Sequence, residues 1–219
     1  MESVIRNALD YIKYIFQNDF SGHDYYHSLR VYRMAVAIAT EEKADADIVA
    51  LAALLHDVDD RKLSPQTAKD KVNAVNFMRS QNAPETVVSQ VLTILDEVSF
   101  KGTDSVTPST LEGKCVQDAD RLDALGAIGI ARTFAYGGSH QRPLYDPEVP
   151  PKLNMNQEAY QKSNSSSLNH FYEKLFLLEN MMNTPTGRRI ARKRTQYMND
   201  FVEEFLSEWD GKLEEVAPA

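Results

Sequence analysis

Histidines and aspartates fall in three separate segments of the chain, each of which has the apolar spacing of a helix. The most apolar of these segments ends in His56 and Asp57, and Asp59 and Asp60 follow at once. A helix C-terminus carries partial negative charge, so carboxylates gathered there are disfavoured by roughly 0.3–1 kcal/mol each. A bound dication would compensate, because it replaces their mutual repulsion with ligation. The alternative is that Asp59 and Asp60 are solvated or cap the element that follows.

The other two segments add a histidine and further carboxylates. His27 stands near the start of one predicted helix, and Asp120 and Asp123 are three residues apart in another, so both carboxylates share one helix face. Buried carboxylates need a charged partner or a metal, and Arg121 and Arg132 offer competing ion pairs. Two imidazoles with carboxylates, each on its own helix, would suit Mn²⁺, Fe²⁺, Co²⁺, Ni²⁺ or Zn²⁺ better than Ca²⁺. A core position remains the alternative for the histidine.

The elements that position these residues are predicted to be helices throughout. Apolar residues recur at helical spacing and no segment alternates strictly, so we expect a single all-α domain over residues 1–219. One segment departs from this pattern: residues 137–167 contain two Gly, four Pro and a serine run, which predicts a lid, a binding loop or a disordered segment. The predicted helices cover about 2–17, 24–42, 45–57, 64–81, 84–99, 108–136, 168–182 and 186–210.

Composition narrows the class of protein. The 219 residues are 42% apolar and 26% charged, as in ordinary globular chains, and the formal charge of −8 argues against broad nucleic-acid binding. The basic run from Arg188 to Arg194 is read as a solvated helix face, offset by acidic residues downstream. The single Cys115 leaves no intramolecular disulfide and no thiolate zinc site. No signal peptide or membrane span is apparent, so we expect a cytoplasmic protein without membrane contact.

Several motifs resemble those of the HD-domain metal-dependent phosphohydrolase superfamily. They are HDYYHSLRV, LLHDVDD and VQDADRLDALGAIGIART, and the late segment SSLNHFYEKLFLLENMMNTPTGRRIARKR is similar to the small bacterial YedJ/YpgQ-like hydrolases within it. The resemblance implies one HD-type domain, with an HD core at about 20–135 and C-terminal helices at 168–212. Carried over position by position, it places the metal ligands on His27, His56, Asp57 and Asp120.

The resemblance also indicates the number of metal ions and the acid–base group. Relatives with two or more metals draw extra histidines from the interval between Asp57 and Asp120, and this chain has none there, so one divalent ion is expected. Mn²⁺ is the first choice, with Mg²⁺, Ni²⁺, Co²⁺, Fe²⁺ and Zn²⁺ as alternatives. Asp60 occupies the position that orients or deprotonates water in relatives, many of which carry Glu there. Glu97 is a second acidic candidate, with an exposed helical glutamate as its alternative.

A phosphate substrate also requires positive charge to neutralise it. The residues that could supply it, each of which could instead form surface salt bridges, are His23, Lys101, Arg121, Arg132, His140, Arg142 and Lys174. A metal centre would polarise a phosphoryl oxygen and lower the pKa of a bound water from 15.7 towards about 7. The resemblance implies a nucleotide substrate and, as the leading activity, (d)NTP hydrolysis that releases pyrophosphate.

Two other functions and the oligomeric state stay open. One is a phosphomonoesterase or phosphodiesterase acting on a nucleotide or a small phosphate ester. The other, from a different class, is a non-catalytic sensor that binds nucleotide through the metal. The released product would distinguish the three: pyrophosphate, orthophosphate, or none despite binding.

Overall fold

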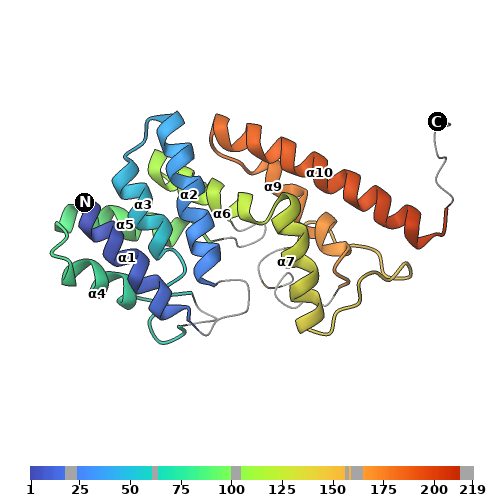
Figure 1. Ribbon diagram of the computed structural model, residues 1–219, viewed down its shortest axis with the longest axis horizontal. Coiled ribbons are helices and arrows are strands. Elements are labelled where there is room, and N and C mark those ends of the chain that lie inside the picture. The colour runs from blue at the N-terminus through green and yellow to red at the C-terminus, as the bar shows by residue number, and fades with distance from the viewer. Residues whose placement is uncertain (18–23, 61–63, 100–104, 156–157, 159–164, 213–219) are drawn as a thin grey trace.

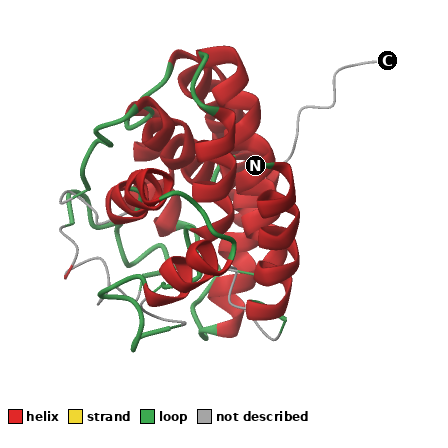
Figure 2. Cartoon of the chain, turned by 90° about the vertical axis from the view of Figure 1, so that its left-hand side faces the viewer, coloured by secondary structure: helices red, strands yellow, loops and turns green. Residues whose placement is uncertain are grey.

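A computed structural model describes residues 1–17, 24–60, 64–99, 105–155, 158 and 165–212 of the chain. Over these residues all regular structure is helical and no strand occurs (Figure 2), which confirms the all-α prediction. None of the helices in this part of the chain is both long and apolar enough to cross a bilayer. His23 and Lys101, both predicted substrate contacts, lie outside the described residues.

The first half of the chain forms a bundle around one buried helix (Figure 1). This helix, α3, has an apolar residue at almost every position, and it lies against α1, α2, α5 and α6. Asp45 caps its N-terminus by accepting hydrogen bonds from the backbone N–H groups of Asp47 and Ile48. The helices of this half are α1 (Glu2–Ile15), α2 (Tyr25–Glu42), α3 (Ala46–Leu55), α4 (Val72–Ser80) and α5 (Glu85–Glu97).

The single helix predicted over 108–136 is wrong, because the chain forms two helices there. They are α6 (Leu111–Asp123) and α7 (Gly126–Ser139), which run in different directions in Figure 1. Gly126 has a φ of 75°, a left-handed backbone that a glycine adopts without steric strain. A Cβ at this position would also lie 3.2 Å from Cγ of Arg194. The break after Asp123 therefore depends on the absence of a side chain at Gly126.

Two more predicted helices are shorter or less regular than expected. The helix predicted over 64–81 begins only at Val72, after a series of turns. The helix predicted over 168–182 consists of a π-helical turn, η1 (Phe171–Leu175), followed by the short α9 (Leu177–Asn180). The last helix, α10 (Pro185–Trp209), begins at the cap Thr184 and packs across α7, as Figure 1 shows.

The segment predicted as a loop over 137–167 is ordered at both of its ends. α7 continues to Ser139, and residues 140–155, the loop that follows α7 in Figure 1, have no regular secondary structure. The backbone N–H of Ser167 donates to the carbonyl of Pro143, at 2.9 Å. Ser165, Ser166 and Ser167 are buried rather than solvated, and the Ser165 hydroxyl donates to Glu173 at 2.6 Å. The serine run therefore belongs to the protein interior.

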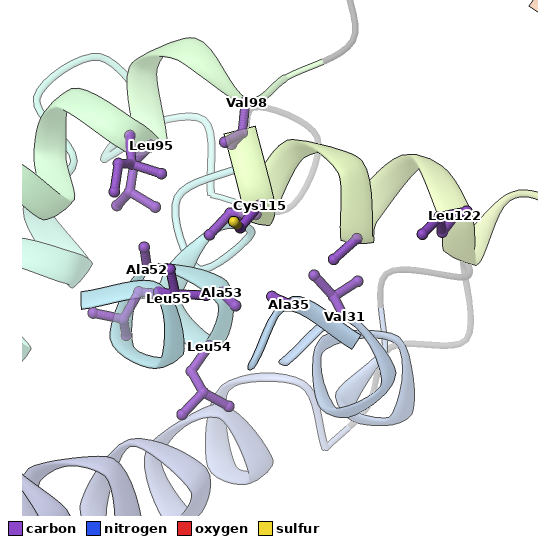
Figure 3. Packing of buried hydrophobic residues seen from close by; sticks show 14 of the residues in the cluster. Val31, Ala35, Ala52, Ala53, Leu54, Leu55, Leu95, Val98, Cys115 and Leu122 are labelled. Atoms are coloured by element: carbon purple, nitrogen blue, oxygen red, sulfur yellow. The ribbon is translucent and has the colours of Figure 1, made fainter. Parts of the chain in front are cut away.

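The core lies where α2, α3, α5 and α6 meet (Figure 3). Figure 3 shows Cys115 of α6 between Val98, at the end of α5, and Leu55 of α3. Burial, together with the negative charge of Asp118, raises the pKa of the Cys115 thiol to about 12. Cys115 is thus a core residue with little tendency to form a reactive thiolate.

Candidate metal centre

Three side chains from two helices converge at one buried point. His27 lies in the first turn of α2, where its backbone N–H donates to the capping carboxylate of Asp24 at 2.7 Å. His56 and Asp57 follow the last residue of α3. One ligand atom from each of His27, His56 and Asp57 lies within 4.8 Å of the other two, a grouping that could hold a metal ion.

The hydrogen bonds of the two imidazole rings aim their remaining lone pairs at this point. Nδ1 of His56 lies 2.8 Å from the carbonyl oxygen of Ala53, and Nδ1 of His27 lies 2.7 Å from Oδ2 of Asp123. Both partners are acceptors, so each Nδ1 carries the proton and, in a neutral ring, each Nε2 carries a lone pair. The two Nε2 atoms are 3.2 Å apart. Two lone pairs at this distance repel one another unless a proton or a cation lies with them.

The spacing of the carboxylates fits the same interpretation. Oδ2 of Asp57 lies 3.4 Å from Nε2 of His27 and 3.2 Å from Nε2 of His56. Oδ1 of Asp120, from α6, lies 3.5 Å and 3.9 Å from the same two nitrogens. An ion with bonds of about 2.1 Å holds neighbouring ligands roughly 3.0–3.4 Å apart. His27, His56 and Asp57 therefore fit a divalent ion with two nitrogen ligands and one oxygen ligand, whereas the Asp120 oxygen lies slightly beyond this range and its role as a fourth ligand stays a prediction.

The electrostatics of the site also favour a positive charge. Burial lowers the pKa of His56, but the carboxylate of Asp57 and that of Asp120 outweigh it and raise this pKa to about 9. Burial likewise opposes the charged form of His27, and hydrogen bonds to Asp123 and Asp57 raise its pKa above the ordinary value. Protons and metal ions compete for the same nitrogens, so a site that stabilises the imidazolium also stabilises a bound cation.

Asp123 supports the centre from behind His27. Its buried carboxylate accepts from His27 Nδ1 at 2.7 Å, from Arg30 Nε at 2.6 Å and from Arg132 Nη1 at 2.6 Å. Burial alone would raise the pKa of Asp123, but these partners hold it well below its usual range. The sequence placed Asp123 on the Asp120 face without assigning it this role; the available signal was Arg30, one turn after His27.

The two other aspartates nearby have structural partners. Asp118 is fully buried and accepts hydrogen bonds from the backbone N–H groups of Asn183 and Thr184, at 2.8 Å each, ahead of α10. Asp59 accepts from the backbone N–H groups of Asn73 and Ala74, so it caps α4. The capping alternative is thus right for Asp59, although its side chain is buried rather than solvated.

The two acidic residues predicted to assist catalysis have different surroundings. Asp60 is partly buried in the turn after Asp57, where its backbone N–H donates to the Asp57 carbonyl at 3.0 Å. Glu97, at the end of α5, accepts hydrogen bonds from the backbone N–H and the hydroxyl of Ser109, at 2.9 Å and 3.1 Å. These contacts make Glu97 an anchor for the segment that leads into α6. A catalytic role for either residue stays a prediction.

The predicted phosphate contacts are not gathered at one place. Arg132 pairs with Asp123 behind His27, whereas the guanidinium of Arg121 donates to the carbonyl of Met181 on another face of α6. His140 is exposed and stacks on Tyr136. Their roles as substrate contacts stay predictions.

Arg142 and Lys174 both lie close enough to His170 for their positive charges to affect its pKa. The guanidinium of Arg142 lies over the Tyr136 ring, 5.4 Å from its centroid. Burial, together with the positive charges of Lys174 and Arg142, lowers the pKa of His170 to about 3. Lys174 belongs to η1, and Arg142 belongs to the segment after α7. The roles of Arg142 and Lys174 as substrate contacts also stay predictions.

The basic run at the start of α10 is largely engaged within the chain. Arg188 donates to the carbonyl oxygens of Met182 and Asn183, and Arg189 pairs with Glu41 at 2.5 Å. The guanidinium of Arg194 donates to the carbonyl of Leu122. These contacts hold α10 to α6 and α2 and leave less free positive charge than the sequence suggested.

Comparison with known proteins places these features in context. The sequence model of the HD domain matches residues 24–125, a range that includes His27, His56, Asp57 and Asp120. The chain is 38% identical over 204 residues to the protein YpgQ of Bacillus subtilis, an alignment that covers 92% of this chain and 91% of YpgQ.

Two crystal structures illustrate how far the fold is shared. An HD-superfamily hydrolase from Bacillus thuringiensis is 40% identical, with a TM-score of 0.77 over 96% of this chain and 99% of the other. YpgQ of Bacillus subtilis in complex with ADP is 36% identical, with a TM-score of 0.72 over 91% and 96% of the two chains. The similarity extends well beyond the segment matched by the HD domain.

Proposed function

The chain belongs to the HD-domain family, and from this premise we propose that it is a metal-dependent phosphohydrolase that acts on nucleotides. The leading specific activity is hydrolysis of a (d)NTP to the monophosphate and pyrophosphate. The HD-superfamily hydrolases among its relatives support the reaction class, and the complex of YpgQ with ADP supports a nucleotide ligand.

One observation carries the proposal: the two Nε2 atoms of His27 and His56 face each other at 3.2 Å, with both Nδ1 atoms already bound to acceptors. Asp57 and Asp120 supply carboxylate oxygens beside them. We propose these four residues as the metal ligands and Mn²⁺ as the first choice of ion. A divalent ion there would supply Lewis-acid polarisation of a phosphoryl oxygen and acidify water.

The chain's own residues would do the remaining work. Asp123, bound to Nδ1 of His27, would orient that ring and hold the proton of the neutral imidazole on Nδ1, so that Nε2 is the nitrogen that faces the metal. Asp60 lies in the turn that follows His56 and Asp57. Its carboxylate would orient the attacking water or accept its proton. Arg132 brings positive charge to the same region through its pair with Asp123.

The proposal is tested with protein that has been stripped of metal and reloaded with Mn²⁺. Each of the common NTPs and dNTPs is supplied, and pyrophosphate and orthophosphate are measured separately. We expect metal-dependent release of pyrophosphate with the matching monophosphate. Orthophosphate alone would favour a phosphomonoesterase or phosphodiesterase, and metal-dependent binding without either product would favour a sensor.

Asp57→Ala provides the matched negative control. The variant loses a carboxylate that lies within 3.4 Å of both imidazole Nε2 atoms, so we expect metal binding and turnover to be lost together. Circular dichroism should show a helical fold that is largely intact, because Asp57 follows the end of α3. Full metal content in this variant would show that the ligand set is wrong.

A further inference from the structure

A polar cavity lies on α6 away from the candidate metal centre. Its volume is about 420 Å³, and it is bounded by residues 105–107, by α6 and by the turn at residues 180–183 that precedes α10. Pockets of this size hold small molecules, whose usual range is roughly 300–1,000 Å³. None of His27, His56, Asp57 or Asp120 lines it.

The lining of the cavity is strongly cationic. Lys114 and Arg121 project from one face of α6, seven residues apart, and Arg188 reaches the cavity from the first turn of α10. Among the described residues that line the cavity none is acidic, whereas Asn183 and Thr107 add neutral polar groups. Three positive charges among these described lining residues favour an anion as the occupant, and the carboxylates of Asp118 and Asp120, which act on Arg121, do not line the cavity.

Arg121 lines the cavity, and its guanidinium includes a buried donor that lacks an acceptor. The residue is only 5% exposed, its Nη1 donates to the carbonyl of Met181, and its Nε has no hydrogen-bond partner within the described part of the chain. Buried polar groups are almost always hydrogen-bonded. An arginine fork with unused N–H groups matches the oxygens of a phosphate, which can accept two of its bonds at once.

The cavity and the metal centre face different directions. Asp120 and Arg121 are consecutive in α6, so their side chains leave the helix roughly 100° apart. The carboxylate of Asp120 approaches His27 Nε2, whereas the guanidinium of Arg121 contacts Met181. Arg121 directly follows the proposed metal ligand Asp120 in the chain. An anion bound to Arg121 would nevertheless be held by the protein and not by the metal.

We propose that this cavity is a second anion-binding site, which takes a phosphate group carried by inorganic phosphate or by a nucleotide. Lys114, Arg121 and Arg188 neutralise its charge, and Asn183 lines the same cavity while its amide donates to Gln117 and Asp118. Arg188 is held at the cavity by its own hydrogen bonds to the carbonyl oxygens of Met182 and Asn183. The site is thus formed before a ligand arrives.

Calorimetric titration of metal-stripped protein with inorganic phosphate tests this site without the metal centre. We expect one phosphate per chain, bound equally well by wild type and by Asp57→Ala. Lys114→Gln should weaken binding by about tenfold, because a charged hydrogen bond is lost. Lys13→Gln, which removes the same charge from an exposed position in α1, should bind as wild type does.

Two outcomes would overturn the proposal. One is the absence of phosphate binding in the metal-free wild type; the other is binding that Asp57→Ala removes and Lys114→Gln leaves unchanged. A tungstate soak of wild-type crystals keeps the test independent of any variant, since anomalous signal in the cavity supports the site and signal only elsewhere contradicts it. None of these measurements requires turnover, so failure here is separate from failure of the proposed hydrolase activity.

ADP and adenosine in place of phosphate distinguish the two sources of the ligand. Tighter binding of ADP than of phosphate would show that the cavity also contacts the nucleoside, whereas equal binding would identify the phosphate group alone as the ligand. Adenosine that binds as tightly as ADP would contradict anion recognition. All three are titrated in the presence of a chelator, so that a metal cannot bridge them to the protein.

Discussion

Replacing Asp123 by asparagine tests the support behind the metal centre with almost no change in shape. The carboxylate now accepts from His27 Nδ1 at 2.7 Å, from Arg30 at 2.6 Å and 2.9 Å, and from Arg132 at 2.6 Å. An amide has one accepting oxygen, and its NH₂ group cannot accept from these donors. Asp123→Asn therefore leaves at least one of the three cationic or N–H partners without its acceptor.

The expected size of the effect follows from these contacts. Loss of an outer partner of a metal-binding histidine typically lowers metal affinity by about 10–100-fold, or roughly 1.4–2.7 kcal/mol. Breaking a fully buried ion pair destabilises a fold by roughly 3–5 kcal/mol. The side chains of Arg30 and Arg132 are 34% and 27% exposed, so water can replace part of what they lose. We therefore expect a loss of about 2 kcal/mol in the free energy of unfolding.

The assay pairs Mn²⁺ titration with urea unfolding, and Asp118→Asn is the control. Asp118 is another buried aspartate of α6, but it accepts from Asn183 and Thr184 and contacts neither imidazole. Both variants should lose stability. Asp123→Asn alone should bind Mn²⁺ at least about tenfold more weakly than wild type.

Two results would refute this reasoning. If Asp123→Asn binds Mn²⁺ within twofold of wild type, the carboxylate does not set the orientation or tautomer of His27. If both variants lose Mn²⁺ affinity equally, the loss follows from general destabilisation, and the contact between Asp123 and His27 has no separate part in it.

Three further predictions concern the turn after α3, the partly buried His170 and the break between α6 and α7. Asp60→Asn should keep its Mn²⁺ and lose about 100-fold or more in kcat; an unchanged kcat would remove Asp60 from the mechanism. The pKa of His170 is lowered to about 3, so between pH 6.5 and 3 the unfolded chain binds a proton that the folded chain does not. The stability that this group contributes is fully present above about pH 6.5 and falls on acidification by at most about 1.4 kcal/mol per pH unit. His170→Gln should therefore reduce the pH dependence of the free energy of urea unfolding between pH 7 and 5, whereas His140→Gln, at an exposed site, should not. Gly126→Ala should destabilise the fold by about 1–3 kcal/mol because φ is 75° there, and an unchanged Tm would show that the backbone can relax.

Local chemistry made several elements predictable from the sequence. The N-termini of α2 and α3 follow Asp24 and Asp45, whose carboxylates accept backbone N–H bonds within three residues. The continuous apolar surface of α3 indicated a central helix, and it is buried along its length. Both signals act over one or two helical turns, so neighbouring residues are enough to specify them.

Long-range contacts decided what the periodicity could not. The apolar pattern over 108–136 runs through Gly126, and only the packing of Arg194 from α10 against that backbone shows why the chain turns there. Likewise, Glu97 reads as an exposed helical glutamate until Ser109 is seen to donate to it. A helix pattern reports which face is apolar and carries no information on where the next helix must go.

The candidate metal centre was likewise predictable in part from the sequence and in part only from the tertiary structure. The sequence by itself placed His27, His56 and Asp57 at helix ends and identified a cluster of aspartates in 118–123, because residue type and helical spacing are local properties. The family resemblance chose Asp120 from that cluster, but only the tertiary structure gave each carboxylate its partner, with Asp120 near the imidazoles, Asp123 behind His27 and Asp118 bound to the residues ahead of α10. The physical reason is that consecutive helical side chains diverge by roughly 100°, so each carboxylate takes the partner that packing brings to its side of α6.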